Sequence, residues 1–143
     1  KIARFLSARA EVSQVFYPGL PDHPGHDIHK RQADGNGAVV SFTTGDEKLS
    51  CDIVESTRLF KVAVSFGSVG STISLPCRMS HASIPAALRD RLAPPPDLVR
   101  LSVGIEDVDD LLADLERAFT KDTKKITPRS ISENRTTQTI IRA

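Results

Sequence analysis

Residues 98–119 carry the pattern that most restricts the fold of this chain. A dense run of β-type apolar residues over 98–105, broken by one arginine and one serine, predicts a buried strand. Gly104 allows a tight turn, and Asp107 offers a carboxylate oxygen that caps the start of a helix. An apolar stripe about one face wide follows at helical spacing, formed by Val108, Leu111, Leu112, Leu115 and Phe119. A buried strand joined by a short turn to an amphipathic helix indicates an α/β fold.

Strands and helices alternate along the rest of the chain. We expect helices over 1–10, 24–32 and 46–57 and after Ser83, and strands over 12–17, 38–42, 59–64 and 72–75. The segments between the strands vary in length, so a repeated βαβ unit is not indicated. We therefore expect a two-layer α/β sandwich, in which a mostly antiparallel sheet of about four or five strands is covered by helices on one face.

The composition is that of one globular domain. The 143 residues are 39% hydrophobic and 26% charged, with a net charge of +1, which gives no indication of a nucleic-acid or anionic-membrane partner. No apolar run approaches the roughly 18 residues of a membrane span, and no signal-peptide pattern is present, so we expect a cytoplasmic protein. The apolar pattern stops near residue 120. We expect one domain at 1–119 and a tail without stable structure at 120–143.

Arg100 is the one charged side chain within the apolar run. Arginine is rarely buried unless it is paired, and its planar guanidinium binds a carboxylate or a phosphate through two hydrogen bonds at once. The residues alone leave two interpretations open. Arg100 is either the partner in a structural ion pair or the centre of an anion-binding site.

Other motifs suggest chemistry less strongly. His23, His26 and His29 are spaced as in a metal site, but steps of three place the first and third about 240° apart around a helix, so we expect no metal site. The glycine pairs in 35–37 and 67–70 do not follow a strand and open a helix, as phosphate loops do. Two isolated cysteines, Cys51 and Cys77, are expected to be reduced thiols.

Four blocks together resemble the enzymes of Cys/Met metabolism that use pyridoxal phosphate (PLP). They are YPGLPDHPGH at 17–26, SFGSVGS at 65–71, LPCRMSHASIP at 75–85 and RLSVGIED at 100–107. The resemblance covers residues 1–119 and is greatest to the fungal cystathionine β-lyases of the family. It implies the C-terminal domain of a fold-type I PLP enzyme that cleaves cystathionine to homocysteine, pyruvate and ammonia.

The resemblance also implies roles for three residues. In the family the arginine of the last block binds the α-carboxylate of the amino-acid substrate, which assigns that role to Arg100. Ser65, the first residue of its loop, and Ser80, before the histidine of the third block, become the accompanying hydroxyl donors. His81 and Ser83 match the family too, and we expect both to be structural.

The chain departs from the family in the loop at 65–71. Ser68 stands where members often have glycine, and Gly70 stands where many have a glutamate near the distal part of the substrate. The absence of that glutamate argues against a γ-type specificity. A cystathionine γ-synthase or γ-lyase remains an alternative, as does a non-catalytic interaction module built on the same sandwich.

The resemblance implies that the catalytic centre lies outside this chain. In the family the Schiff-base lysine, the acid that pairs with the pyridinium nitrogen and the phosphate cradle belong to a large N-terminal domain. No such lysine is identifiable here, and the sequence begins at Lys1 already in helical register. We therefore assign no catalytic, cofactor-binding or metal-binding residue. We expect that domain as the partner, a homo-oligomeric full-length enzyme, and no activity from the isolated chain.

Overall fold

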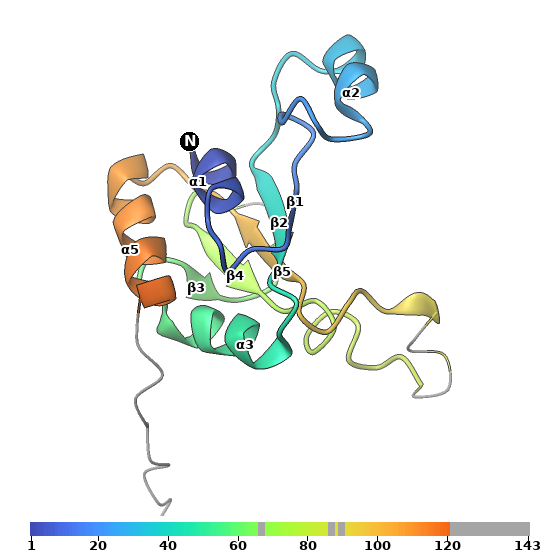
Figure 1. Cartoon of the computed structure of the whole chain (residues 1–143), viewed down its shortest axis with the longest axis vertical. Coiled ribbons are helices and arrows are strands. Elements are labelled where there is room, and N and C mark those ends of the chain that lie inside the picture. Colours follow the sequence, from blue (N-terminus) through green and yellow to red (C-terminus); the bar gives the residue numbers. More distant parts are fainter. Residues whose placement is uncertain (66–67, 86–87, 89–90, 121–143) are drawn as a thin grey trace, which may run out of the picture.

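A computed structural model describes residues 1–65, 68–85, 88 and 91–120 and contains one mixed sheet. The strand order is β1-β2-β5-β4-β3, and every neighbouring pair is antiparallel except the parallel pair β3 and β4. The strands are β1 (Gln14–Phe16), β2 (Val39–Thr43), β3 (Lys61–Val62), β4 (Thr72–Ser74) and β5 (Val99–Ser102). The expected sandwich with a mostly antiparallel sheet is confirmed, and the RLSVGIED block begins on its central strand (Figure 1).

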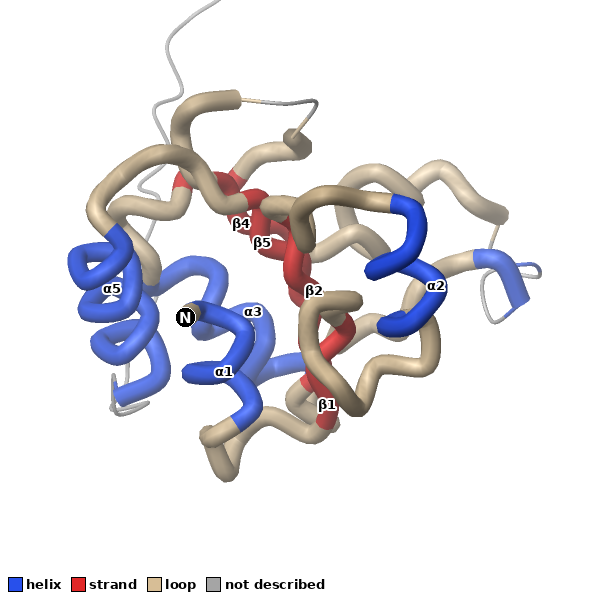
Figure 2. Tube along the Cα trace, turned by 90° about the horizontal axis from the view of Figure 1, so that it is seen from above, coloured by secondary structure: helices blue, strands red, loops and turns tan. Residues whose placement is uncertain are grey.

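The helices that the structure describes are α1 (Ile2–Ser7), α2 (His26–Gln32), α3 (Glu47–Ser56) and α5 (Val108–Thr120). Three of them form the second layer. Figure 2 shows α1, α3 and α5 together on one face of the sheet, as expected. The exception is α2, which projects away from the sheet on the connection between β1 and β2 (Figure 1). It has no buried residue, because Ile28 is its one aliphatic side chain and that residue is 52% exposed.

The core forms where the apolar stripe of α5 meets the sheet. Leu111 and Leu115 on the helix are fully buried, and so are Val99 and Leu101 on β5. The Phe119 ring lies 5.9 Å from that of Phe42, measured between centroids. Each such side chain contributes roughly 1.5–3 kcal/mol to stability through its removal from water.

The start of α5 is capped as the sequence predicts. The Asp107 carboxylate accepts hydrogen bonds from the backbone N–H groups of Asp109 and Asp110, at 2.8 and 3.4 Å. Asp46 caps α3 in the same way, accepting from Lys48 and Leu49. Both carboxylates satisfy N–H groups that have no partner within the first turn of a helix.

The structure corrects the bounds of two strands. The strand expected over 59–64 is reduced to Lys61–Val62, because the backbone N–H groups of residues 58–60 donate to the buried carboxylate of Asp114 instead. The strand expected over 98–105 ends at Ser102, and Ile105 is 83% exposed. The helix expected after Ser83 falls largely outside the described residues, as does the tail from residue 121 onward.

In the part of the chain that the structure describes, no helix is long and apolar enough to cross a membrane.

Candidate anion-binding site

The period of the strand places Arg100 on the face of the sheet opposite the helices. Val99 and Leu101 face the core, so Arg100 and Ser102 point the other way along β5. The neighbours of Arg100 across the sheet are Ser41 on β2 and Ser74 on β4. These neighbouring side chains are short, and Arg100 as a whole residue is half-buried.

Arg100 has no protein anion beside it. Among the described residues its guanidinium makes no ion pair and no hydrogen bond, whereas Arg9, Arg78 and Arg117 each bind a carboxylate. The guanidinium carries five N–H donors, and the residue as a whole is half-buried. The described residues thus supply no partner for the structural ion pair, which favours the interpretation of Arg100 as an anion-binding residue.

The structure brings Ser65 to the same face of the sheet. The Ser65 hydroxyl donates a 3.0 Å hydrogen bond to the hydroxyl oxygen of Ser102. Ser102 lies two residues from Arg100 on the same side of β5, which corresponds to a Cα separation of roughly 7 Å. Ser102 was not singled out in the sequence, although its position at i+2 from Arg100 in a strand was a signal that it shares that face.

The end of the 65–71 loop is fastened to the turn between β5 and α5. Glu106 accepts hydrogen bonds from the Ser71 backbone N–H at 2.7 Å and from the Ser71 hydroxyl at 2.8 Å. The same hydroxyl oxygen accepts from the Gly104 N–H at 2.8 Å. The backbone N–H of Ser71 is the largest influence on the Glu106 carboxyl, and it lowers the pKa of that group. The ionised carboxylate therefore holds the loop.

Gly104 lies in close contact with this loop. A Cβ atom at Gly104 would overlap the carbonyl oxygen of Val69, and it would approach the Gly70 carbonyl carbon to 2.8 Å. Both of these obstacles are backbone atoms, so the loop itself would have to move. The glycine of the RLSVGIED block is thus required by packing.

We expect Gly104→Ala to lower the free energy of unfolding by about 1–3 kcal/mol, the usual cost of overpacking a close contact. Urea denaturation of the chain measures this loss. Gly35→Ala is the matched control, because a Cβ atom there meets nothing within 4 Å. Equal denaturation midpoints for the two variants would contradict the packing role of Gly104.

Ser80 lies in a separate turn. Its hydroxyl hydrogen-bonds with Nδ1 of His81 at 2.9 Å and donates to the carbonyl of Pro76 at 3.4 Å, and neither bond involves Arg100. Residues 75–85, which include this turn, extend away from the sheet (Figure 1). The His81 N–H donates to the Pro76 carbonyl at 2.9 Å, which fits the expected structural role of that residue.

The three histidines of the 17–29 region each bind a backbone group nearby. Nδ1 of His23 accepts a hydrogen bond from the Gly25 N–H. Nδ1 of His26 lies 2.8 Å from the Pro18 carbonyl oxygen, and Nε2 of His29 lies 2.9 Å from the Gly35 carbonyl oxygen. No group of three or more metal-ligating side chains occurs among the described residues. These hydrogen bonds join residues within the connection between β1 and β2, which gives the histidines a structural role.

The described residues do not fit a PLP site. A lysine that carries PLP must have a pKa low enough to act as a nucleophile, and burial is the usual cause. The lysines in the described part of the chain are all exposed: Lys1, Lys30, Lys48 and Lys61. None of them is therefore a candidate to bind the cofactor covalently.

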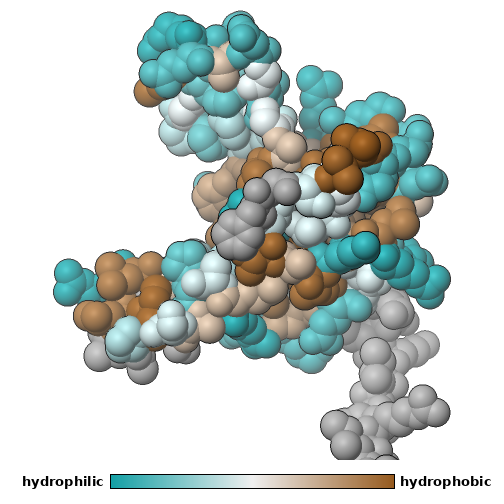
Figure 3. Space-filling view, turned by 180° about the vertical axis from the view of Figure 1, so that it is seen from behind, coloured by the Kyte–Doolittle hydropathy of each residue, from teal (hydrophilic) through white to brown (hydrophobic). Residues whose placement is uncertain are grey.

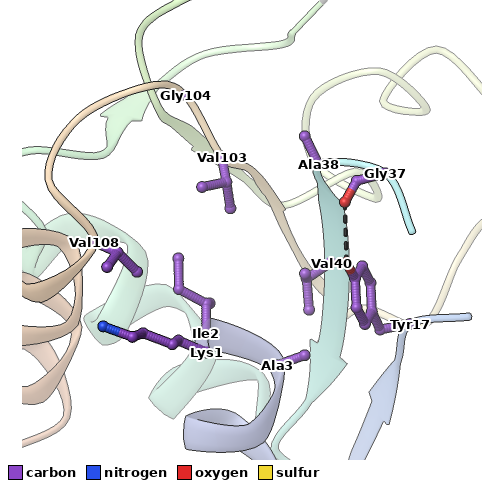
Figure 4. Close-up of a pocket in the computed structure, with 10 residues that line it drawn as sticks. All are labelled: Lys1, Ile2, Ala3, Tyr17, Gly37, Ala38, Val40, Val103, Gly104 and Val108. Atoms are coloured by element: carbon purple, nitrogen blue, oxygen red, sulfur yellow. Dashed lines mark hydrogen bonds between the residues drawn. The ribbon is translucent and has the colours of Figure 1, made fainter. Parts of the chain in front are cut away.

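A cavity of about 270 Å³ lies away from Arg100, between α1, the start of β2 and residues 103–108 (Figure 4). Apolar side chains and backbone dominate its lining. Its one charged side chain, Lys1, pairs with Asp109 at 3.2 Å, and the Tyr17 hydroxyl donates to the Gly37 carbonyl. It contains none of the residues that the sequence singled out for binding.

A model of the family described as Cys/Met metabolism PLP-dependent enzymes matches residues 1–120. The chain belongs to this family. A chloroplastic cystathionine β-lyase of Arabidopsis thaliana is 59% identical over 83% of this chain, and a cystathionine β-lyase of Neurospora crassa is 55% identical over the same share. The chain spans 26% of the length of each of these relatives.

Solved structures of the family share the fold. The structure of a cystathionine γ-lyase from Lactobacillus plantarum, complexed with L-serine, matches with a TM-score of 0.76 and 40% identity. The match covers 82% of this chain and 31% of that one. This member of the Cys/Met metabolism family therefore shares the fold of the matched part of PLP-dependent lyases of fold type I.

Proposed function

We propose that this chain supplies the substrate-carboxylate site of a PLP-dependent carbon–sulfur lyase. The whole enzyme would cleave cystathionine by β-elimination, consuming one water and releasing homocysteine, pyruvate and ammonia. One observation supports the assignment of the site: Arg100, a half-buried residue, has no anion partner among the described residues and shares its face of the sheet with the Ser65–Ser102 hydroxyl pair. The choice of cystathionine rests on the β-lyase relatives at 55–59% identity.

Arg100 would bind the α-carboxylate through two parallel hydrogen bonds, with the Ser65 hydroxyl beside it. A bidentate contact restricts rotation of the carboxylate as well as its position. The substrate Cα is then held at one angle toward the reacting groups, and a displacement of about 1 Å costs roughly a hundredfold in rate. PLP, when bound elsewhere in the enzyme, supplies the electron sink for bond cleavage at that carbon.

Ser80 is the second hydroxyl donor of the proposal, after Ser65. Its side chain is exposed on a turn, and the neighbouring His81 orients the hydroxyl. For the Ser80 hydroxyl to contact the substrate, the turn that carries Ser80 must lie beside the route by which the amino acid reaches Arg100.

The proposal includes a partner for the exposed apolar surface beside the loop. Val69 and Ile105 are 70% and 83% exposed, and the Ile105 N–H donates to the Val69 carbonyl, so the two residues are adjacent. Figure 3 shows apolar side chains gathered in patches on the rear face of the molecule. Such patches mark contact surfaces. We assign the PLP-binding domain as the partner of this surface in a homo-oligomeric enzyme.

The compartment is also part of the proposal. We place the enzyme in the cytoplasm, although the Arabidopsis relative is named as chloroplastic.

Incubation of the whole enzyme with cystathionine tests the reaction. We expect pyruvate as the keto acid, because β-elimination leaves the three-carbon fragment. Release of 2-oxobutyrate instead would establish the γ-lyase alternative. The 40% identity to a cystathionine γ-lyase is the observation that supports this alternative. No keto acid from a protein that binds PLP would support the non-catalytic module.

A further inference from the structure

We infer that Glu106 is a positioning residue for the carboxylate site, acting through Ser71 on the loop that carries Ser65. This inference rests on the proposed function of Arg100 and Ser65. It assigns a role in substrate binding to a carboxylate whose negative charge excludes direct contact with the substrate anion.

Glu106 is free for this role because the helix does not need it. The following residue, Asp107, caps α5 with its own carboxylate. Glu106 instead turns back toward the sheet and accepts two hydrogen bonds from Ser71, one from the backbone and one from the hydroxyl. Two bonds to one residue fix both the position and the direction of the chain at that point.

Ser71 transmits this restraint to the sheet and the loop. It is 1% exposed, and its hydroxyl oxygen accepts from the Gly104 N–H. The Ser71 carbonyl accepts a hydrogen bond from the Lys61 N–H at 3.0 Å, which joins the end of the loop to β3, the strand that precedes the loop. The described parts of the loop are attached to the 102–106 segment at Ser71 by Glu106 and at Ser65 by the hydrogen bond to Ser102.

Loss of the Glu106 carboxylate removes the one attachment to a charged group and leaves the neutral hydrogen bonds, among them those from Ile105 to Val69 and from Ser65 to Ser102. A hydrogen bond to an ionised acceptor is worth about twice a bond between two neutral groups, such as the one from Ser65 to Ser102. Without it, the Ser65 hydroxyl samples a wider range of positions relative to Arg100. The grip on a substrate carboxylate then weakens although every group that touches it is still present.

The test compares the binding of L-alanine with that of L-alaninamide, which lacks the carboxylate, to the whole enzyme by titration calorimetry. We expect wild type to prefer the acid and Glu106→Ala to lower the ratio of the two affinities roughly tenfold, the worth of one charge-assisted hydrogen bond. A fall in stability or in the amount of folded protein leaves that ratio unchanged, so the readout separates positioning from a merely structural role.

Three further variants complete the design. Glu55→Ala, at an exposed glutamate of α3, is expected to keep the wild-type ratio. Ser71→Ala removes the hydroxyl alone, and it replaces Glu106→Ala if that variant fails to fold. In the double variant Glu106→Ala with Ser65→Ala, we expect a ratio no lower than that of Ser65→Ala, because both changes act on one interaction.

Two outcomes overturn the inference, and they differ. An unchanged ratio in Glu106→Ala and Ser71→Ala, with preference for the acid in wild type, shows that Glu106 does not position the site. Equal affinities for acid and amide in wild type remove the carboxylate site itself, and with it the proposed role of Arg100.

Discussion

Arg100→Lys in the whole enzyme is expected to lower kcat/KM for cystathionine by at least about a hundredfold. Lysine keeps the positive charge but offers a compact ammonium in place of the planar fork, so the second hydrogen bond to the carboxylate is lost. The remaining contact no longer fixes the angle of the substrate, and misplacement of about 1 Å has an effect of that size. Steady-state kinetics with cystathionine measure the change.

The stability of the same variant separates binding from structure. The described residues give Arg100 no ion-pair partner, so we expect the free energy of unfolding of Arg100→Lys to remain within about 0.5 kcal/mol of wild type. Arg4→Lys, at an exposed arginine of α1, serves as the control for both measurements. Near-wild-type kcat/KM for Arg100→Lys would refute the carboxylate-binding role.

Asp114→Ala is expected to lower the free energy of unfolding of the chain by about 3–5 kcal/mol. Asp114 is 4% exposed and accepts hydrogen bonds from the consecutive backbone N–H groups of Arg58, Leu59 and Phe60, between 2.9 and 3.3 Å. It also pairs with Arg117, whose guanidinium donates to the Ser56 carbonyl. Removing the carboxylate leaves three donors and a charge without their acceptor.

Urea denaturation of the 143-residue chain measures this loss. Asp110→Ala is the matched control on the same helix, because that side chain is exposed in the first turn and contributes well under about 1 kcal/mol through the helix dipole. Asp114→Asn keeps the shape but places an amide N–H₂ against N–H donors, so we expect it to recover little of the stability. A loss below about 1 kcal/mol in Asp114→Ala would show that water replaces the carboxylate there.

The local elements of this fold follow from local sequence. The apolar stripe of α5, its Asp107 cap and the alternation of β5 each depend on residues within a few positions of one another. The same alternation places Arg100 on the face away from the core. The short β3 was not predictable in this way, because its apolar residues suggest a longer strand over 59–64. The carboxylate that takes up the backbone N–H groups before it comes from residue 114.

In the candidate site too, some features follow from local sequence and others depend on contacts between distant residues. The residues around Arg100 leave an ion pair and an anion-binding site open, and only the resemblance to a family predicts the anion-binding role and names Ser65 and Ser80 as its companions. The hydrogen bond between Ser65 and Ser102 joins residues 37 positions apart, and that between Ser71 and Glu106 joins residues 35 apart. Nothing in the spacing of these residues predicts such pairs, because each depends on the strand order that places β4 beside β5.

The sequence by itself therefore determined the strand, turn and helix of 98–119, the polarity of each face and the place of the one arginine within that strand. Periodicity and capping are short-range properties, so they can be read along the chain. Only the tertiary structure decided what surrounds Arg100. It places serines on both sides, supplies no carboxylate among the described residues, and holds the Ser65 loop with Glu106. These contacts form only when β5 pairs with both β2 and β4, since contacts between distant residues depend on the packing of the whole sheet.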